Sequence, residues 1–181
     1  LTNACGLACK HCRATAMPEP APGELTTEES VALLDEVARF GDPLPHMIMS
    51  GGDPLRRPDV FELLEEARDR GIGVSLSPAS TPELTREKMV RMQQAGTRAM
   101  SISIDGSNPA LHDGVRRVPG TFALAMRELD WAGELGIPVQ INTLVTAATM
   151  PDLPELYRML CSKPIQRWTL FFLIRTGRGK M

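Results

Sequence analysis

Short apolar runs alternate along this chain with segments whose apolar residues recur at helical spacing, and glycines separate many of these segments. This alternation constrains the fold most, because strands linked by helices form a parallel sheet with right-handed crossovers. We therefore predict an α/β fold, as an open sheet or as a barrel. The expected strands are 47–49, 74–76, 99–104, 139–145 and 168–174, and the expected helices are 27–40, 58–70, 85–94, 122–135 and 153–160.

Polar residues follow several of these strands. In open α/β sheets and in barrels, ligands bind at the carboxyl ends of the strands. Gly51-Gly52-Asp53 follows the first expected strand, Ser77 the second and Asp105 the third. We therefore expect the functional site to contain these residues.

The composition is that of one folded domain spanning residues 1–181, with 43% hydrophobic residues. Acidic residues number 22 and basic residues 20, so no basic excess is present to bind nucleic acid. The run from Leu170 to Ile174 is far shorter than a membrane-spanning helix. No charged segment followed by an apolar one opens the sequence, so we expect no intact secretory signal. We expect a cytoplasmic protein without nucleic-acid or membrane partners. Because the sequence starts at Leu1 and stops without a closing helix, we expect it to be a fragment of a longer protein.

Three of the four cysteines, Cys5, Cys9 and Cys12, lie within eight residues, whereas Cys161 is distant. Three adjacent thiols favour metal binding over a disulfide scaffold. They can hold three corners of a [4Fe-4S] cluster and leave one iron open. The alternative is a structural zinc site that uses His11 or Cys161 as the fourth ligand. Apart from that alternative, we expect Cys161 to be a small buried residue on a helix.

The spacing Cys5-x-x-x-Cys9-x-x-Cys12 resembles that of the radical S-adenosylmethionine (radical SAM) superfamily, in which SAM chelates the open iron of the cluster. The segment Ser50-Gly51-Gly52-Asp53-Pro54 is similar to the family's GGEP-type loop, with Asp53 in place of Glu. By this resemblance, the backbone of Gly51, Gly52, Asp53 and Pro54 would receive the methionine amino group of SAM. Without the cysteines, Gly51-Gly52 would instead be typical of a tight turn with positive φ.

Ser101, Ser103 and Asp105 alternate, so they share one face of the expected strand. Polar residues on a parallel strand are unusual, and a cofactor would supply their hydrogen-bond partners. The resemblance implies that Ser103 and Asp105 face SAM. Residues 112–122 resemble a loop of the peptide- and haem-modifying branches, in which the position of Arg116 binds the SAM carboxylate. By the same resemblance, a ribose contact would come from Asn142, and adenine contacts from Leu173 and from His11, mainly through its backbone.

The resemblance covers nearly the whole chain and implies a partial (β/α)6 TIM-like barrel whose first strand is missing or reduced to Leu1-Thr2. It is closest to the subgroup with a C-terminal SPASM-type extension, which is absent from residues 1–181. At the end of the expected strand 74–76, Pro78-Ala79-Ser80 replaces the family's Thr-Asn-Gly. The implied function is reductive cleavage of SAM to a 5′-deoxyadenosyl radical, which abstracts hydrogen from a peptide or a haem-type tetrapyrrole. An external donor of the flavodoxin or ferredoxin type would supply the electron.

Overall fold

The computed structural model describes residues 1–180 and contains one five-stranded sheet. All strand pairs are parallel, and the strands lie in the order β1-β2-β3-β4-β5, so each strand pairs with its neighbours in sequence. The predicted α/β fold is confirmed, and every expected strand is found within a few residues of its predicted bounds. The strands are β1 (Met47–Met49), β2 (Val74–Leu76), β3 (Thr97–Ser103), β4 (Val139–Val145) and β5 (Arg167–Phe172).

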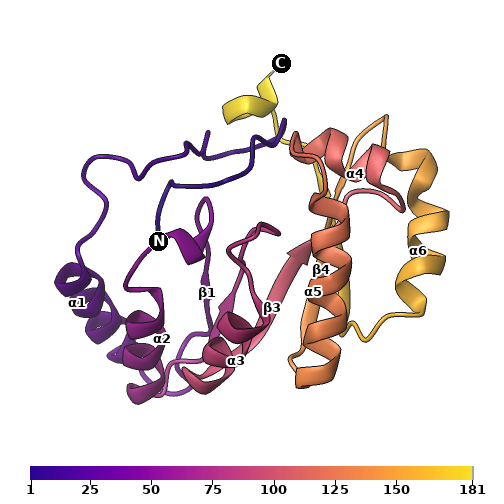
Figure 1. The fold of residues 1–181 in the computed structure, drawn as a ribbon. Helices are drawn as coiled ribbons and strands as arrows, with labels where there is room; N and C mark the ends of the chain where they lie inside the picture. Colours follow the sequence, from indigo (N-terminus) through magenta and orange to yellow (C-terminus); the bar gives the residue numbers. More distant parts are fainter. Residues whose placement is uncertain (181) are drawn as a thin grey trace.

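The helices lie on the outer side of this sheet, which curls into half a barrel (Figure 1). They are α1 (Thr27–Ala38), α2 (Val60–Asp69), α3 (Arg86–Gln94), α4 (Pro109–Arg116), α5 (Thr121–Leu135) and α6 (Leu153–Cys161), with short 3₁₀ turns η1 (Pro54–Arg56), η2 (Met150–Asp152) and η3 (Gly177–Lys180). Local signals explain their starts. For example, Thr26 Oγ1 accepts a hydrogen bond from Glu29 N, and Glu29 Oε2 accepts one from Thr26 N, which completes a capping box.

Two expectations were wrong. Residues 112–116, expected as part of the loop 112–122, belong to helix α4, which begins at Pro109 because Asn108 Oδ1 caps Leu111 N and Pro109 occupies the first turn. Cys161, expected to be buried, is exposed at the end of α6. Leu156 and Leu160 form the buried face of that helix, and Cys161 points to another side.

The two faces of the sheet differ in chemistry. Met100 and Ile102 of β3 are buried with Ile141 of β4 in the core beneath the helices. Ser101 and Ser103 alternate with them and are only partly buried, and Ser103 is in register with Asn142. The predicted polar inner face of β3 is therefore confirmed.

The first four residues lie alongside the segment 50–53, which comes directly after β1. The Leu1 amino group donates to Ser50 O (2.8 Å), Gly52 N donates to Thr2 O (2.7 Å), and Asp53 N donates to Ala4 O (2.7 Å). No strand is assigned here, which agrees with a first strand that is missing or reduced to Leu1-Thr2. In the described part of the chain, no helix combines the length and hydrophobicity that crossing a bilayer requires.

Candidate active site

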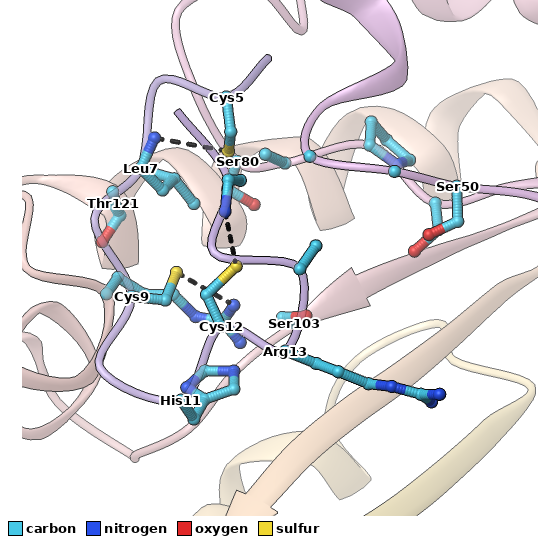
Figure 2. Close-up of a pocket in the computed structure, with 18 of the residues that line it drawn as sticks. Cys5, Leu7, Cys9, His11, Cys12, Arg13, Ser50, Ser80, Ser103 and Thr121 are labelled. Carbon is cyan, nitrogen blue, oxygen red and sulfur yellow. Dashed lines mark hydrogen bonds between the residues drawn. The ribbon is translucent and has the colours of Figure 1, made fainter. Parts of the chain in front are cut away.

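The segment that carries Cys5, Cys9 and Cys12, residues 5–16, lies across one end of the sheet, and we call it the cysteine loop. Its backbone is tied to neighbouring segments: Cys5 N donates to Met17 O (2.7 Å), and Lys10 N donates to Val115 O of α4 (3.0 Å). All three cysteines line one cavity of about 560 Å³ (Figure 2). The structure therefore brings together the thiols that the sequence grouped.

Each of the three sulfur atoms accepts a hydrogen bond from an N–H group. The donors are Leu7 N to Cys5 Sγ (3.4 Å), Ala16 N to Cys12 Sγ (3.3 Å) and Arg116 Nη1 to Cys9 Sγ (3.7 Å). Burial raises the pKa of the Cys5 thiol, so Cys5 favours its neutral form until a cation or cluster binds it. Hydrogen bonds to sulfur are a feature of iron–sulfur sites, where they stabilise the anionic ligands and adjust the reduction potential.

The three thiols surround a space instead of meeting at one point. Within residues 1–180, no group of three or more His, Cys, Asp or Glu side chains is arranged to hold a single metal ion. A cubane cluster has a different requirement, because each cysteine binds a different iron atom. His11 lines the same cavity, but Cys161 does not, so the structure does not bring Cys161 to the other three cysteines. The donor set and the cavity fit a cluster.

Arg116 connects the cysteine loop to the end of β3. Its Nη2 lies 2.6 Å from Asp105 Oδ2, while Asp105 Oδ1 accepts a hydrogen bond from Leu144 N (2.8 Å). Burial opposes the charge of Arg116, but Asp105 and Cys9 outweigh this effect and raise the pKa of the guanidinium. A positive charge is thus fixed at the cavity wall, as binding of a carboxylate requires.

His112 supports this pair from α4. Its Nδ1 accepts a hydrogen bond from Asp105 N (3.1 Å), which places the ring proton on Nε2. Burial, reinforced by the nearby Arg116 charge, lowers the pKa of His112 to about 4. The ring is therefore neutral at physiological pH and anchors α4 to the backbone at the end of β3.

A second cavity of about 430 Å³ adjoins the first and shares His11, Ser103 and Arg116 with it. Asp105, Asn142 and Leu173 also line this cavity, so the structure groups the residues predicted around the ribose and adenine. Burial lowers the pKa of His11, and its Nδ1 is buried without a hydrogen-bond partner. The two cavities form a continuous site along the carboxyl ends of the strands.

Gly51 and Gly52 line the first cavity, and neither has a positive φ. The alternative of a turn that needs positive φ is therefore wrong. These positions need glycine because the first residues of the chain approach closely: a Cβ on Gly51 would overlap Thr2 O, and one on Gly52 would overlap Ala4 O.

Asp53 and Pro54 are not among the residues that line either cavity. The fully buried Asp53 accepts hydrogen bonds from Ala79 N (3.3 Å) and Thr81 Oγ1 (3.2 Å), so its side chain holds the loop after β2. Burial raises the pKa of Asp53, and these hydrogen bonds oppose the rise. A backbone contact from Asp53 or Pro54 to SAM stays a prediction.

Sequence reasoning assigned no role to several other residues at the cavity. Ser80 lines it, and its hydroxyl donates to Glu128 Oε2 of α5 (2.6 Å). The sequence does contain a signal for Glu128: this residue is charged, yet it lies on the same helix face as the apolar residues Ala125, Leu129 and Ala132. The other cavity residues without an assigned role are Leu7, Arg13, Ala14, Ala16, Ser50, Pro78, Ala79, His112, Thr121 and Arg178.

Comparison with known proteins identifies the family. Residues 1–160 match the profile of the radical SAM superfamily. The chain belongs to this superfamily. Its members use a [4Fe-4S] cluster and SAM, which are the cofactors that the cysteine spacing and the glycine loop imply.

The chain is similar to two curated proteins named AdoMet-dependent heme synthase. It is 41% identical over 179 residues to the protein of Oleidesulfovibrio alaskensis, covering 99% of this chain and 45% of the relative. It is 42% identical over 179 residues to the protein of Nitratidesulfovibrio vulgaris, covering 99% of this chain and 48% of the relative. The radical SAM chain described here thus spans about half the length of these relatives.

The fold also matches a solved structure described as native anSMEcpe with bound AdoMet and Kp18Cys peptide. The TM-score is 0.80 at 16% identity, and the match covers 96% of this chain and 49% of that protein. This likeness confirms the predicted TIM-like, partial-barrel fold.

Proposed function

We propose that this chain is the cluster- and SAM-binding core of an enzyme that modifies a haem-type tetrapyrrole. The observation that carries the proposal is the placement of Cys5, Cys9 and Cys12 around one cavity that continues into the polar cavity of Ser103 and Arg116. A cluster held by these cysteines would supply the electron for reductive cleavage of SAM, and the chemistry would be hydrogen abstraction from the substrate by a 5′-deoxyadenosyl radical.

The protein's part is to bind, orient and exclude water. The three cysteines would ligate three irons, and the Arg116 guanidinium would hold the SAM carboxylate. The backbone of Gly51 and Gly52, which line the first cavity, would receive the methionine amino group. Ser103 and Asn142 would contact the adenosyl part of SAM, next to Leu173 and His11. None of these roles requires a general acid or base.

Two observations support a tetrapyrrole over a peptide as substrate. The relatives at 41% and 42% identity are named heme synthases. In addition, Phe171, Phe172 and Arg13 are among the residues that line the second cavity, and the Arg13 side chain extends away from the cysteine sulfur atoms (Figure 2). A flat apolar ring that carries carboxylate groups fits aromatic side chains next to a guanidinium.

The proposal extends to the setting of the enzyme. The chain would be the core domain of a protein with a SPASM-type extension, located in the cytoplasm, and a flavodoxin- or ferredoxin-type donor would supply the electron.

The test of the substrate class is deuterium transfer. The reconstituted chain is incubated anaerobically with SAM, dithionite and either a side-chain-deuterated haem-type tetrapyrrole or a deuterated peptide. We expect deuterium in 5′-deoxyadenosine with the tetrapyrrole alone. Deuterium from the peptide, or from neither compound, would contradict the tetrapyrrole assignment for this chain.

A further inference from the structure

The C-terminal turn η3 contacts the cysteine loop from the opposite end of the sequence. Arg178 Nε donates to Cys9 O (2.9 Å), and Arg178 Nη1 donates to Ala16 O (2.7 Å). The backbone N–H of Arg178 donates to Cys12 O (3.0 Å). One residue therefore satisfies three carbonyl groups along the loop, across a separation of 169 residues from Cys9.

The glycines on both sides of Arg178 make this approach possible. Gly177 has a φ of +54°, and a Cβ there would overlap the carbonyl oxygens of Cys12 and Arg13. Gly179 is buried, and a Cβ there would lie 3.1 Å from Leu173 Cδ1 and 3.3 Å from Ile174 O, which is tighter than an ordinary contact. Glycine at position 177 thus permits the close approach to the cysteine loop, and glycine at position 179 lets the same turn pack against residues 173–174.

The geometry of the Arg178 side chain suits this bridge. A guanidinium is planar and presents several N–H groups in a fixed arrangement, so one arginine is able to span two carbonyl groups. In the ion pairs formed among residues 1–180, Arg178 takes no part. Its charge therefore remains available to a negative group in the cavity that it lines.

We propose that Arg178 is a positioning residue for the cluster: it fixes the cysteine loop and places a positive charge beside the site. The second half of this inference rests on the proposed cluster. An iron–sulfur cluster held by three thiolates is net negative and becomes more negative on reduction. A nearby cation therefore raises its reduction potential.

The first readout uses the protein without iron and so does not depend on the proposed function. In Arg178→Gln, we expect amide exchange at Cys12 and Thr15 at least about tenfold faster than in the parent, because charge-assisted hydrogen bonds to the loop are lost. Exchange at Ile141, in the core strand β4, should stay at the parent rate, which shows that the variant is folded. Lys180→Gln, an exposed cation in the same turn, is the matched control and should behave like the parent.

The second readout uses anaerobically reconstituted protein. We expect Arg178→Gln to bind less than half of the parent's iron, and its remaining cluster to have a more negative reduction potential. Arg178→Lys keeps the charge but cannot span two carbonyl groups, so it should restore the potential more than it restores loop protection.

Parent-like exchange and iron content in Arg178→Gln would overturn the inference, as would a parent-like potential in that variant. If the parent itself binds no iron while Arg178→Gln still loosens the loop, the proposed function fails and the loop contact stands.

Discussion

Replacing Glu128 by Gln is expected to stabilise the protein at neutral pH. It should also remove the pH dependence that Glu128 gives to the free energy of unfolding. Glu128 is completely buried, and one of its carboxyl oxygens, Oε1, has no hydrogen-bond partner. Burial raises the pKa of Glu128 from an ordinary value of 4.5 to about 8, although the Ser80 hydroxyl opposes the rise. The folded protein therefore keeps a proton on Glu128 that the unfolded chain has lost.

This difference fixes the sign and the size of the effect. Because the folded state binds more protons, Glu128 makes the free energy of unfolding fall as the pH rises from 4.5 towards about 8. Each pH unit within this interval changes the free energy by about 1.4 kcal/mol, which gives about 3 kcal/mol by pH 7. In Glu128→Gln this loss is absent, and the amide is still able to hydrogen-bond Ser80.

Urea unfolding of the parent and of Glu128→Gln at several pH values between 4 and 8 measures this prediction. We expect the difference between the two free energies of unfolding to grow by about 3 kcal/mol in favour of the variant between pH 4.5 and pH 7. Glu65→Gln, an exposed glutamate on α2, serves as the control and should follow the parent. A difference that stays constant over this pH range would refute the reasoning that Glu128 is protonated in the folded protein.

Two further substitutions test the site. Arg116→Met should destabilise the protein by about 3 kcal/mol in thermal or urea unfolding, because the buried Asp105 carboxylate loses its partner. The same variant should show no measurable SAM binding in calorimetry. An unchanged free energy of unfolding would contradict a buried ion pair. Gly52→Ala should lower iron content after reconstitution by more than half, since the new Cβ overlaps Ala4 O next to the cysteine loop. In the control Gly114→Ala, the added Cβ has no atom within 4 Å, so this variant should keep the parent's iron content. Equal iron content in the two variants would show that the close approach at Gly52 is unimportant.

The positions of the strands and the polar inner face could be predicted because their signals are local. Short apolar runs mark the strands, glycines follow several of the helical segments between them, and the alternation of Ser101 and Ser103 with apolar residues shows which face is polar. The parallel register then places Ser103 next to Asn142, two residues that the family resemblance assigns to the same cofactor. The cysteine spacing likewise identified three side chains that line one cavity.

Other features depend on contacts that leave no local pattern. Helix α4 was missed although Asn108 and Pro109 are good helix-start residues, because the segment is short and contains Gly114. The contact between Arg178 and Cys9 joins opposite ends of the sequence, and no periodicity reports it. The role of Asp53 as a clamp on the loop after β2 appears only when Ala79 is folded next to it.

The most direct test of the central claim is the formation of 5′-deoxyadenosine by the chain and by Cys9→Ala after anaerobic reconstitution, with SAM and dithionite, measured by mass spectrometry. The account predicts a product from the parent, visible absorption that bleaches on reduction, and neither in Cys9→Ala. Cys161→Ala, changed at the exposed cysteine outside the cavity, should match the parent. A colourless parent that binds zinc and forms no 5′-deoxyadenosine would contradict the claim that these three cysteines hold a SAM-cleaving cluster.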